Sequence, residues 1–511
     1  MLLHLGLVKL SLNRGYYLMK MSGGLKITIY AILIMGSILT ITTYTSGLTG
    51  DIITLNPSIT YQKMTGWEMV AQAGQDDSSA FPNYQDQLFD KAVNEAGINR
   101  LRLEIKSGAE NTTDSWSQYQ AGIISYQTFR CLRYSTINDD NDPFNINWNG
   151  FQFAWFDSAI DKIVLPIKQK IEANGEKLHI NLNYVAFTGQ MRQTGCPSGL
   201  QYIHNNPDEY AELVLATYLH MQTKYGFVPD TWEVILEPDL VSEWTNKGNL
   251  IGQAIVAAAN RLKANGFTPR FILPSTTSMA NAVPYFDQAI QVVGALQYIS
   301  EISYHRYGGA TLGNLQNIAN RAAQYNIGGA MLEWWNSANS YQTLHQDIKI
   351  GRNSAWQQGV VGGLASDNPP TALYVIDDTN PSNPIITMGS KTKFTRQYYK
   401  FIRKGAVRIE ATSNNTAFDP LAFINVNGGY VAVVNASTGG SFSLQGLPVG
   451  TYGIFYTTAT QYNINLPDVT INANQALTTN IPAAGVLTVY AKSGGASDTV
   501  PPSPPQNLTV N

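Results

Sequence analysis

The chain has 511 residues, and its 33 Lys and Arg nearly balance its 36 Asp and Glu, for a formal net charge of −3 at pH 7. This balance and the lack of a basic run argue against nucleic-acid binding. A hydrophobic content of 44% excludes disorder over most of the length. Only 14% of the residues are charged, and 28 Tyr and 9 Trp accompany many amides and hydroxyls. Such a composition suits an extracellular protein that handles neutral polymers.

The first 50 residues have the pattern of an export leader. Lys20 and Lys26 supply positive charge, residues 27–41 form an apolar run, and Ser46 and Gly47 offer small residues for cleavage. Because the run is shorter than the roughly 20 residues of a membrane-spanning helix, we expect a signal peptide. The protein would then be secreted or attached to the cell surface, with no stable membrane partner. An uncleaved anchor is the alternative interpretation.

Cys131 and Cys196 are the only cysteines of the chain. In an exported protein they could form one disulfide or remain two free thiols, and the sequence leaves both possibilities open. Neither cysteine has metal-ligand spacing, and nor do the six His. We therefore expect no metal, no organic cofactor and a monomer.

From residue 51 the pattern alternates between strands and helices. We predict eight strands, at residues 63–69, 100–105, 178–184, 231–237, 270–274, 299–304, 329–333 and 359–364. The clearest helical periodicities lie between them, at residues 151–173, 207–225, 249–265 and 312–325. This alternation predicts an α/β fold, a (β/α)8 TIM barrel over residues 51–390. A doubly wound sheet is the competing topology, but no Gly-rich phosphate loop follows the first strand.

From about Phe394 the apolar periodicity changes to two. Short segments such as GGYVAVVNAS and TYGIFYTT, separated by Gly, Pro and Asn, predict a C-terminal antiparallel β-sandwich over residues 391–492. The first strands of the 51–390 segment could join this sandwich. Residues 493–511 contain four Pro and have the composition of a linker or tail.

Two predicted barrel strands end in a glutamate, at the edge where TIM barrels place their catalytic groups. TWEVILEP places Glu237 at the end of the fourth strand, and GGAMLEWW places Glu333 at the end of the seventh. Two carboxyls about 5–5.5 Å apart suit retaining glycoside cleavage, in which one protonates the leaving oxygen and the other attacks the anomeric carbon. For either Glu alone a salt bridge or a solvated rim position is the ordinary interpretation, whereas the pair is far more specific.

Other side chains near strand ends could complete such a site. Arg102, inside the second strand, needs an anion, and either Glu333 or Glu104 could provide it. Further polar and aromatic residues are candidates for binding or orienting a sugar, with structural packing as the alternative for each: Trp67, Asn183, Tyr184, His305, Tyr307, Trp334 and Trp335.

Five segments, in order, resemble clan A glycoside hydrolases and above all family 30. ITYQKMTGWE is similar to the opening strand pair, GINRLRLEI to the second strand, EVILEPDL to the acid/base strand and GGAMLEWW to the nucleophile strand. YYKFIRKGAVRIEATS resembles the join between barrel and side sandwich, so the similarity covers roughly residues 53–492. The resemblance implies the following roles: Glu237 as acid/base, Glu333 as nucleophile, Arg102 as the residue orienting the nucleophile, and His305 or Tyr307 as cleft residues.

The chain departs from that clan at Leu236. The clan has Asn immediately before the acid/base Glu, where it binds the sugar 2-hydroxyl through a hydrogen bond that strengthens in the transition state. The leading hypothesis is a secreted retaining O-glycosyl hydrolase that degrades a polysaccharide or oligosaccharide. The alternative is a non-catalytic glycan-binding or cell-surface protein on the same scaffold. An inverting variant would need a wider carboxyl gap, of about 6.5–9.5 Å.

Overall fold

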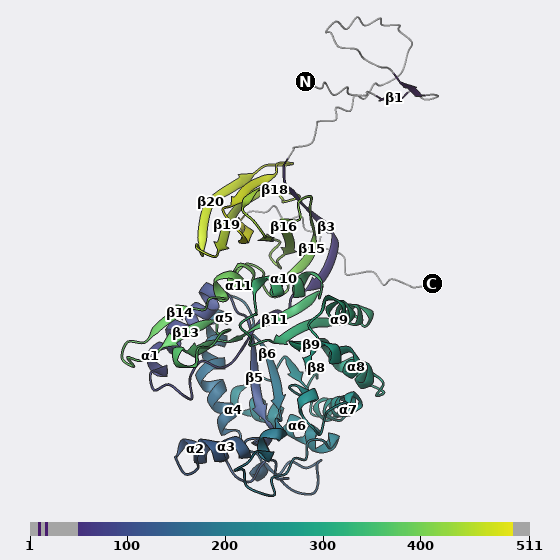
Figure 1. The fold of residues 1–511 in the computed structure, drawn as a ribbon. Coiled ribbons are helices and arrows are strands. Elements are labelled where there is room, and N and C mark those ends of the chain that lie inside the picture. Colours follow the sequence, from purple (N-terminus) through teal and green to yellow (C-terminus); the bar gives the residue numbers. More distant parts are fainter. Residues whose placement is uncertain (1–8, 12–15, 19–49, 494–511) are drawn as a thin grey trace, which may run out of the picture. The chain divides into compact units, whose positions relative to one another are not determined.

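The computed structural model describes residues 9–11, 16–18 and 50–493 (Figure 1). The chain separates into two compact units, Met1–Thr49 and Gly50–Asn511. In the first unit, β1 (Lys9–Ser11) pairs antiparallel with β2 (Tyr16–Leu18). The leader features at residues 20–47 and the tail at residues 494–511 lie outside the described residues. No helix in the described part of the chain is long and apolar enough to cross a membrane.

A closed barrel of eight parallel strands forms the larger part of the second unit. Its order is β10-β11-β4-β5-β6-β7-β8-β9, which confirms the predicted TIM barrel. The strands are β4 (Gly66–Val70), β5 (Arg100–Lys106), β6 (His179–Val185), β7 (Thr231–Glu233), β8 (Phe271–Ser278), β9 (Ile299–Gly308), β10 (Gly328–Glu333) and β11 (Asn353–Val360).

Helices follow most of these strands and cover the outside of the barrel (Figure 1). Helix α6 coincides with the prediction for residues 207–225: the Asn206 side chain caps its first turn, Pro207 begins it, and Gly226 ends it in a left-handed conformation. The predicted helix 151–173 is two helices joined by a π-helical turn, Ile160–Val164. The helices are α1 (Phe81–Asp90), α2 (Ser115–Gln120), α3 (Tyr126–Leu132), α4 (Ala154–Ala159), α5 (Leu165–Ala173), α6 (Pro207–Tyr225), α7 (Gly248–Ala264), α8 (Met279–Ile290), α9 (Leu312–Gln324) and α10 (Tyr341–Lys349).

The position of the eighth strand was predicted wrongly. The barrel is closed by β11, while residues 362–364 form β12 (Gly362–Leu364) in a small sheet with β13 (Tyr374–Asp377) and β14 (Ile385–Met388). The predicted segment GVVGGL is apolar, whereas β11 begins with the polar run NSAWQQ. The polar residues suit the barrel because part of its interior is polar: Gln357 of β11 donates to the buried Glu68 of β4 over 2.8 Å.

The barrel interior contains ion pairs as well as apolar side chains. Arg100 on β5 binds Glu68 on β4 (2.6 Å) and Glu301 on β9 (2.8 Å). Strands β5 and β9 stand on opposite sides of the closed barrel, so the second ion pair crosses it. A separate small apolar cluster fills part of the interior: Ile272, Ala330, Leu332 and Ala355.

The C-terminal domain is a nine-stranded, mainly antiparallel sheet in the order β20-β19-β22-β17-β16-β15-β3-β18-β21. Strand β3 (Ile52–Lys63) precedes the barrel in sequence yet pairs here with β15 and β18. Strands from both ends of the order share one apolar core, as expected for a sandwich. The other strands are β15 (Val407–Ser413), β16 (Phe418–Ile424), β17 (Tyr430–Ala436), β18 (Gly440–Gln445), β19 (Gly450–Thr458), β20 (Ile464–Ile471), β21 (Leu477–Ile481) and β22 (Gly485–Ser493).

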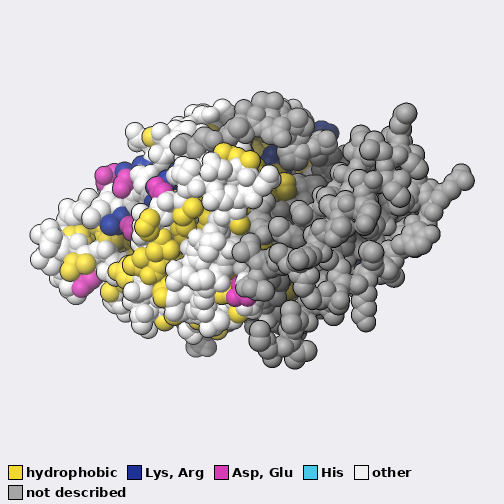
Figure 2. All heavy atoms as spheres, turned by 90° about the horizontal axis from the view of Figure 1, so that it is seen from above, with side chains coloured by type: hydrophobic (Ala, Val, Ile, Leu, Met, Phe, Trp, Pro, Cys, Tyr) yellow, Lys and Arg dark blue, Asp and Glu magenta, His cyan; other side chains and the backbone are white. Residues whose placement is uncertain are grey.

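Helix α11 (Thr392–Tyr399) joins the barrel to this domain. Gln397 connects the two through hydrogen bonds to Thr457 of β19 (3.0 Å) and Thr488 of β22 (2.8 Å). On the face shown in Figure 2, charged side chains are few and scattered among hydrophobic ones, in keeping with the low charged content of the sequence.

Candidate active site

Glu237 lies just beyond the C-terminal end of β7. The regular pairing of β7 stops at Glu233, but the chain continues alongside the neighbouring strands β6 and β8 as far as Glu237. The amide of Leu236 donates to the Tyr184 carbonyl of β6 over 2.9 Å, and the amide of Glu237 donates to the Ser275 carbonyl of β8 over 3.1 Å. Glu237 then adopts left-handed backbone angles, φ 49° and ψ 58°, and a short helix, Pro238–Leu240, begins. A non-glycine residue in this region costs about 1–3 kcal/mol, and such residues cluster at functional sites.

Glu333 ends β10, and both of its carboxylate oxygens accept a hydrogen bond. Arg102 Nη2 donates to Oε2 over 2.6 Å, and the Tyr307 hydroxyl of β9 donates to Oε1 over 3.1 Å. Burial, followed by the charge of Glu333, raises the pKa of Tyr307 above its usual range, so the phenol keeps the proton that it donates. The two donors stabilise the Glu333 carboxylate and set its orientation.

The guanidinium of Arg102 is buried and connects Glu333 to a second carboxylate. Burial alone would lower the pKa of Arg102, but the charges of Glu333, Glu233 and Glu104 raise it instead. The pKa of Glu104 is lowered to about 2, because Lys106 and Arg102 outweigh the effect of its burial. Arg102 therefore serves both of the anions that the sequence offered as alternatives, with Glu333 at 2.6 Å and Glu104 at 3.3 Å.

His305 lies between the two strand-end glutamates. Its Nδ1 is 2.9 Å from Glu237 Oε1, so one proton lies between the ring and the carboxyl group. Burial lowers the pKa of His305, but the hydrogen bond to Glu237 and the charges of Glu333 and Glu237 raise it overall. This contact leaves Glu237 Oε2 without a hydrogen bond from any described residue.

The spacing of these groups is short. One carboxylate oxygen of Glu237, one of Glu333 and a ring nitrogen of His305 all lie within 4.8 Å of one another. Among the described residues, this is the only group of three or more His, Cys, Asp or Glu so close together. The carboxylate gap resembles the 5–5.5 Å of retaining glycosidases and is smaller than the 6.5–9.5 Å of inverting ones.

A cavity of about 500 Å³ opens beside this pair rather than around it, with Arg102, Glu104 and Trp335 on its near side. Its aromatic wall comes from the connections that follow β5, where Trp116 stacks on Trp155 with ring centroids 5.1 Å apart. Asp76, Asp77 and Asp367 are among its other lining residues. The rest of the aromatic wall consists of Tyr119, Tyr126 and Phe129.

This aromatic wall is absent from the residues predicted for the site. The sequence does contain a signal for it, a concentration of aromatic residues in the long connection between the strand at 100–105 and the helix at 151–173: Trp116, Tyr119, Tyr126 and Phe129. Helices α2 and α3, which contain them, cap their own first turns through Asp114 and Ser125 and are too short to show apolar periodicity.

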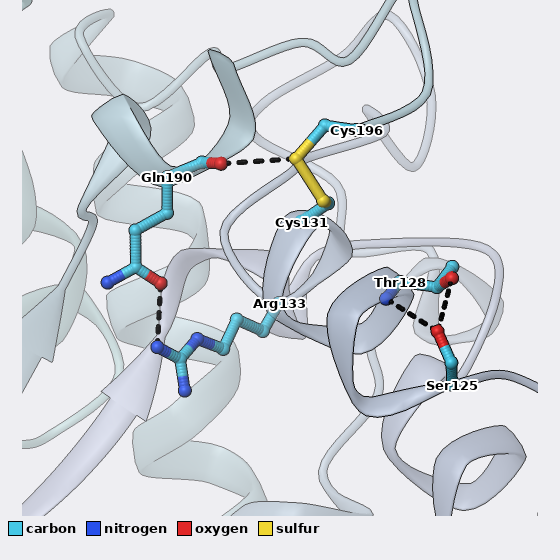
Figure 3. The surroundings of a disulfide bond; sticks show 6 residues. All are labelled: Ser125, Thr128, Cys131, Arg133, Gln190 and Cys196. Atoms are coloured by element: carbon cyan, nitrogen blue, oxygen red, sulfur yellow. Dashed lines mark hydrogen bonds between the residues drawn. A yellow bond between two sulfur atoms is a disulfide. The ribbon is translucent and has the colours of Figure 1, made fainter. Parts of the chain in front are cut away.

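A disulfide between Cys131 and Cys196 holds this part of the site (Figure 3). Cys131 is in α3, after β5, and Cys196 follows the short helix Thr188–Arg192, after β6. Beside the bond, Arg133 Nη2 donates to Gln190 Oε1 over 2.7 Å. Of the two states that the sequence left open, the structure has the paired one, which ties two neighbouring loops together.

Two of the predicted site residues are placed elsewhere. Trp67 is buried where barrel and sandwich meet: its Nε1 donates to the Ile402 carbonyl over 2.6 Å, and its ring stacks on Tyr399. Tyr184 packs against Tyr210 of α6, outside the barrel. The physical reason is the alternation of side chains along a strand. Glu68 faces the interior, so its neighbour Trp67 faces outward.

The remaining predicted residues lie near the carboxylates without all lining the cavity. Trp335 lines it, and its amide donates to the Tyr307 hydroxyl over 3.0 Å. Trp334 is half-buried under Arg306. Asn183 is fully buried on β6, and neither atom of its side-chain amide has a hydrogen-bond partner among the described residues. Leu236 packs in an apolar cluster with Tyr134, Val185 and Met191, so nothing at its position can bind a sugar hydroxyl.

No family model and no curated protein matches the chain in sequence. In structure it is similar to a GH30 endoxylanase from Clostridium papyrosolvens C71, at 17% identity and a TM-score of 0.59 over 86% of this chain and 100% of that chain. The GH30 catalytic domain of xylanase C from Talaromyces cellulolyticus is similar at 16% identity and a TM-score of 0.61, over 86% of this chain and 100% of that chain. An endo-β-1,6-glucanase is similar at 15% identity and a TM-score of 0.59, over 86% of this chain and 94% of that chain. The chain has the family 30 fold. At these identities the likeness confirms the expected architecture, and the chemistry of this family 30 fold has to be argued from its own residues.

Proposed function

We propose that the chain is a retaining O-glycosyl hydrolase in which Glu333 is the nucleophile and Glu237 the acid/base. The observation behind the proposal is the pair of strand-end carboxylates within 4.8 Å. Their surroundings differ: Glu333 accepts from Arg102 and Tyr307, whereas the Glu237 side chain has a hydrogen bond with only one described residue, His305. Different surroundings are what allow one carboxyl group to act as an acid while the other acts as an anion.

The chemistry takes two steps. First, Glu237 donates a proton to the glycosidic oxygen while Glu333 attacks the anomeric carbon, so the C–O bond breaks and a glycosyl ester of Glu333 forms. Next, Glu237 removes a proton from water, the water oxygen attacks the anomeric carbon, and the carboxylate of Glu333 leaves. Arg102 and Tyr307 keep that carboxylate oriented at the start and at the end of the cycle.

The cavity supports a poly- or oligosaccharide as substrate. Its aromatic wall offers flat apolar faces, which suit sugar C–H surfaces, and indole N–H groups that can donate to hydroxyls. The structurally similar proteins are xylanases and an endo-β-1,6-glucanase, which makes xylan and β-1,6-glucan the first polymers to test. The Cys131–Cys196 disulfide suits an oxidising compartment, in agreement with a secreted protein.

Leu236 favours the second candidate, a non-catalytic glycan-binding protein. Its position in an apolar cluster removes the 2-hydroxyl contact that clan A enzymes make there. The intact arrangement around Glu333 is the argument against this candidate, because binding alone does not require a buried Arg and a Tyr on one carboxylate.

The test is reducing-end release from xylan, β-1,6-glucan and other β-glucans and galactans. Wild type is compared with Glu333→Gln, Glu237→Gln and, as a control, the exposed Glu172→Gln on α5. We expect release by wild type and the control, none by Glu333→Gln, and a loss of about 10²–10⁴-fold in Glu237→Gln. The first product seen by proton NMR should keep the anomeric configuration of the substrate. An inverted product would reject the mechanism, and tight binding without release would leave the glycan-binding function.

A further inference from the structure

A cavity of about 370 Å³ lies where the sandwich meets the barrel. Its walls come from β3, β15 and β16 of the sandwich and from the last residue of α10, Lys349 (Figure 1). Lys349 and the nearby Arg352 precede β11, so they stand at the end of the barrel opposite to the strand ends that bear Glu237 and Glu333. The cavity is therefore separate from the active site.

The decisive residue of this cavity is Arg408 on β15. Arg408 lines the cavity and is only 6% exposed. Its Nε donates to Gln62 Oε1 over 2.9 Å. Neither Nη group has a hydrogen bond with a described residue, although both keep some accessible surface. A buried guanidinium thus presents two unused donor groups to an open space.

Gln62 holds the guanidinium in this orientation. The Gln62 Nε2 group donates to the carbonyls of Ile348 over 2.8 Å and Asn353 over 3.2 Å, both in the barrel domain, so Oε1 is left to accept from Arg408. This contact occupies Nε and leaves Nη1 and Nη2. Two neighbouring N–H donors of a guanidinium suit the two oxygens of a carboxylate, phosphate or sulfate group.

The surroundings of Arg408 add positive charge. The guanidinium carbon of Arg408 lies 3.9 Å from the centre of the Tyr61 ring, and that of the exposed Arg352 lies 5.5 Å from the same centre. Burial, and to a smaller extent the charge of Arg352, lowers the pKa of Arg408 to about 10. The buried Arg100 and Arg102 differ in this respect, because each binds a carboxylate over 2.6 Å.

No carboxylate among the described residues forms an ion pair with Arg408 or Arg352. Asp419 is already engaged, because Lys349 binds one of its oxygens and His345 Nε2 lies 3.4 Å from the other. Glu410 lines the cavity without forming an ion pair with any described residue. Buried charges in proteins are normally paired, so Arg408 calls for an anion from outside the chain.

We propose that Arg408 and Arg352 bind one oxyanion in this cavity, a phosphate, sulfate or carboxylate group. Arg408 supplies two hydrogen bonds from its Nη groups, and Arg352 supplies further positive charge. Because Arg408 belongs to the sandwich and Arg352 to the barrel, the anion connects the two domains. The group can come from a free anion or from an acidic polysaccharide, and this binding does not depend on the proposed hydrolase activity.

The experiment is calorimetric titration of sodium phosphate, sodium sulfate and polygalacturonate into full-length protein in chloride buffer, at constant ionic strength. We expect one phosphate or sulfate per chain and a higher Tm than in NaCl of the same ionic strength, because a ligand of the folded state stabilises it. Polygalacturonate that binds through Arg408 would identify an acidic polysaccharide as the source. Phosphate and sulfate binding without it would identify a free anion.

Matched variants assign the binding to the cavity. Arg408→Met should weaken binding about 10–100-fold, the effect of losing hydrogen bonds to a charged group. In NaCl its Tm should equal or exceed that of wild type, because the substitution removes a buried charge without a partner. Arg352→Gln should weaken binding about two- to fivefold, and Glu410→Gln should strengthen it by a similar factor. Arg270→Gln, exposed elsewhere on the barrel, should bind as wild type does.

Three results would overturn the proposal. The first is no binding of phosphate or sulfate at millimolar concentrations and no rise of Tm beyond that in NaCl. The second is binding that is unchanged in Arg408→Met. The third is a Tm in NaCl that falls in both Arg408→Met and Glu410→Gln, which would mean that Glu410 already compensates the charge of Arg408 within the chain.

Discussion

Replacing Arg100 by Met tests whether the ion pairs inside the barrel hold it together. The Arg100 side chain is fully buried and makes four short polar contacts: Glu68 Oε2 at 2.6 Å, Glu301 Oε1 and Oε2 at 2.9 and 2.8 Å, and Thr65 Oγ1 at 2.9 Å. Burial alone would lower the pKa of Arg100, but the charges of Glu301 and Glu68 raise it above its usual value. Arg100 is therefore charged at every pH at which the protein folds.

The expected magnitude follows from what the substitution leaves behind. Glu68 has no exposed side-chain surface and Glu301 has 3%, so solvent cannot screen them once the guanidinium is gone. Removing one partner of a buried ion pair costs about 3–5 kcal/mol, because the other charge stays buried without compensation. Here two carboxylates lose their cation, so we expect the upper part of that range, a large share of the ~5–15 kcal/mol that stabilises a typical domain.

The assay is urea unfolding followed by tryptophan fluorescence, which reports on Trp67, Trp232 and Trp356 in or next to the barrel wall. The matched control is the triple variant Arg100→Met, Glu68→Gln, Glu301→Gln. Replacing a whole buried charged triad by neutral side chains is often close to neutral, so the triple variant should recover most of the loss. A cost below about 1 kcal/mol for Arg100→Met, or a triple variant less stable than the single one, would refute the reasoning.

Three further predictions concern Tyr307, the disulfide and the buried Glu212. Tyr307→Phe removes one of the two donors to Glu333 and should lower kcat about tenfold, the low end for a hydrogen bond to a charged group because Tyr307 is 41% exposed; steady-state kinetics will show it. Reducing the Cys131–Cys196 bond, which closes a loop of 65 residues, should lower the free energy of unfolding by up to about 4 kcal/mol. Reductant should therefore lower the Tm of wild type, and it should leave the Tm of a Cys131→Ser, Cys196→Ser variant unchanged. Wild type should lose stability as pH rises from about 4.5 towards 9, because burial, followed by the charges of Asp139, Glu110 and Glu209, raises the pKa of Glu212 from about 4.5 in the unfolded chain to about 9 in the folded one. Glu212→Gln should flatten that slope in pH-dependent unfolding.

The meeting of Glu237 with Glu333 could be predicted because each Glu ends a segment with a strong local signal. TWEVIL and GGAML are apolar runs of strand length, and Pro238 or an aromatic pair stops each one. In a barrel, a strand-end position is sufficient to bring side chains to one face. Arg102, His305 and Tyr307 followed for the same reason, since all are on strands that reach that face.

The direction of a side chain within a barrel strand could not be predicted in the same way. Strands of a TIM barrel are buried on both sides, so the apolar pattern is nearly continuous and does not reveal which alternate residue faces inward. Trp67 and Tyr184 were placed in the cleft for that reason, although both face helices or the sandwich. The eighth strand was missed because its inward residues are polar partners of a buried carboxylate.

The sequence by itself determined the fold class, the change from barrel to sandwich near residue 390, and the identity of the two strand-end glutamates, because these depend on local periodicity and on where strands stop. Only the tertiary structure decided the pairing of Cys131 with Cys196, the aromatic wall beside Arg102 and the ion pair of Arg100 with Glu301 across the barrel. These features join residues that are far apart in the chain, and the closure of the barrel, not any local pattern, sets the distances between them.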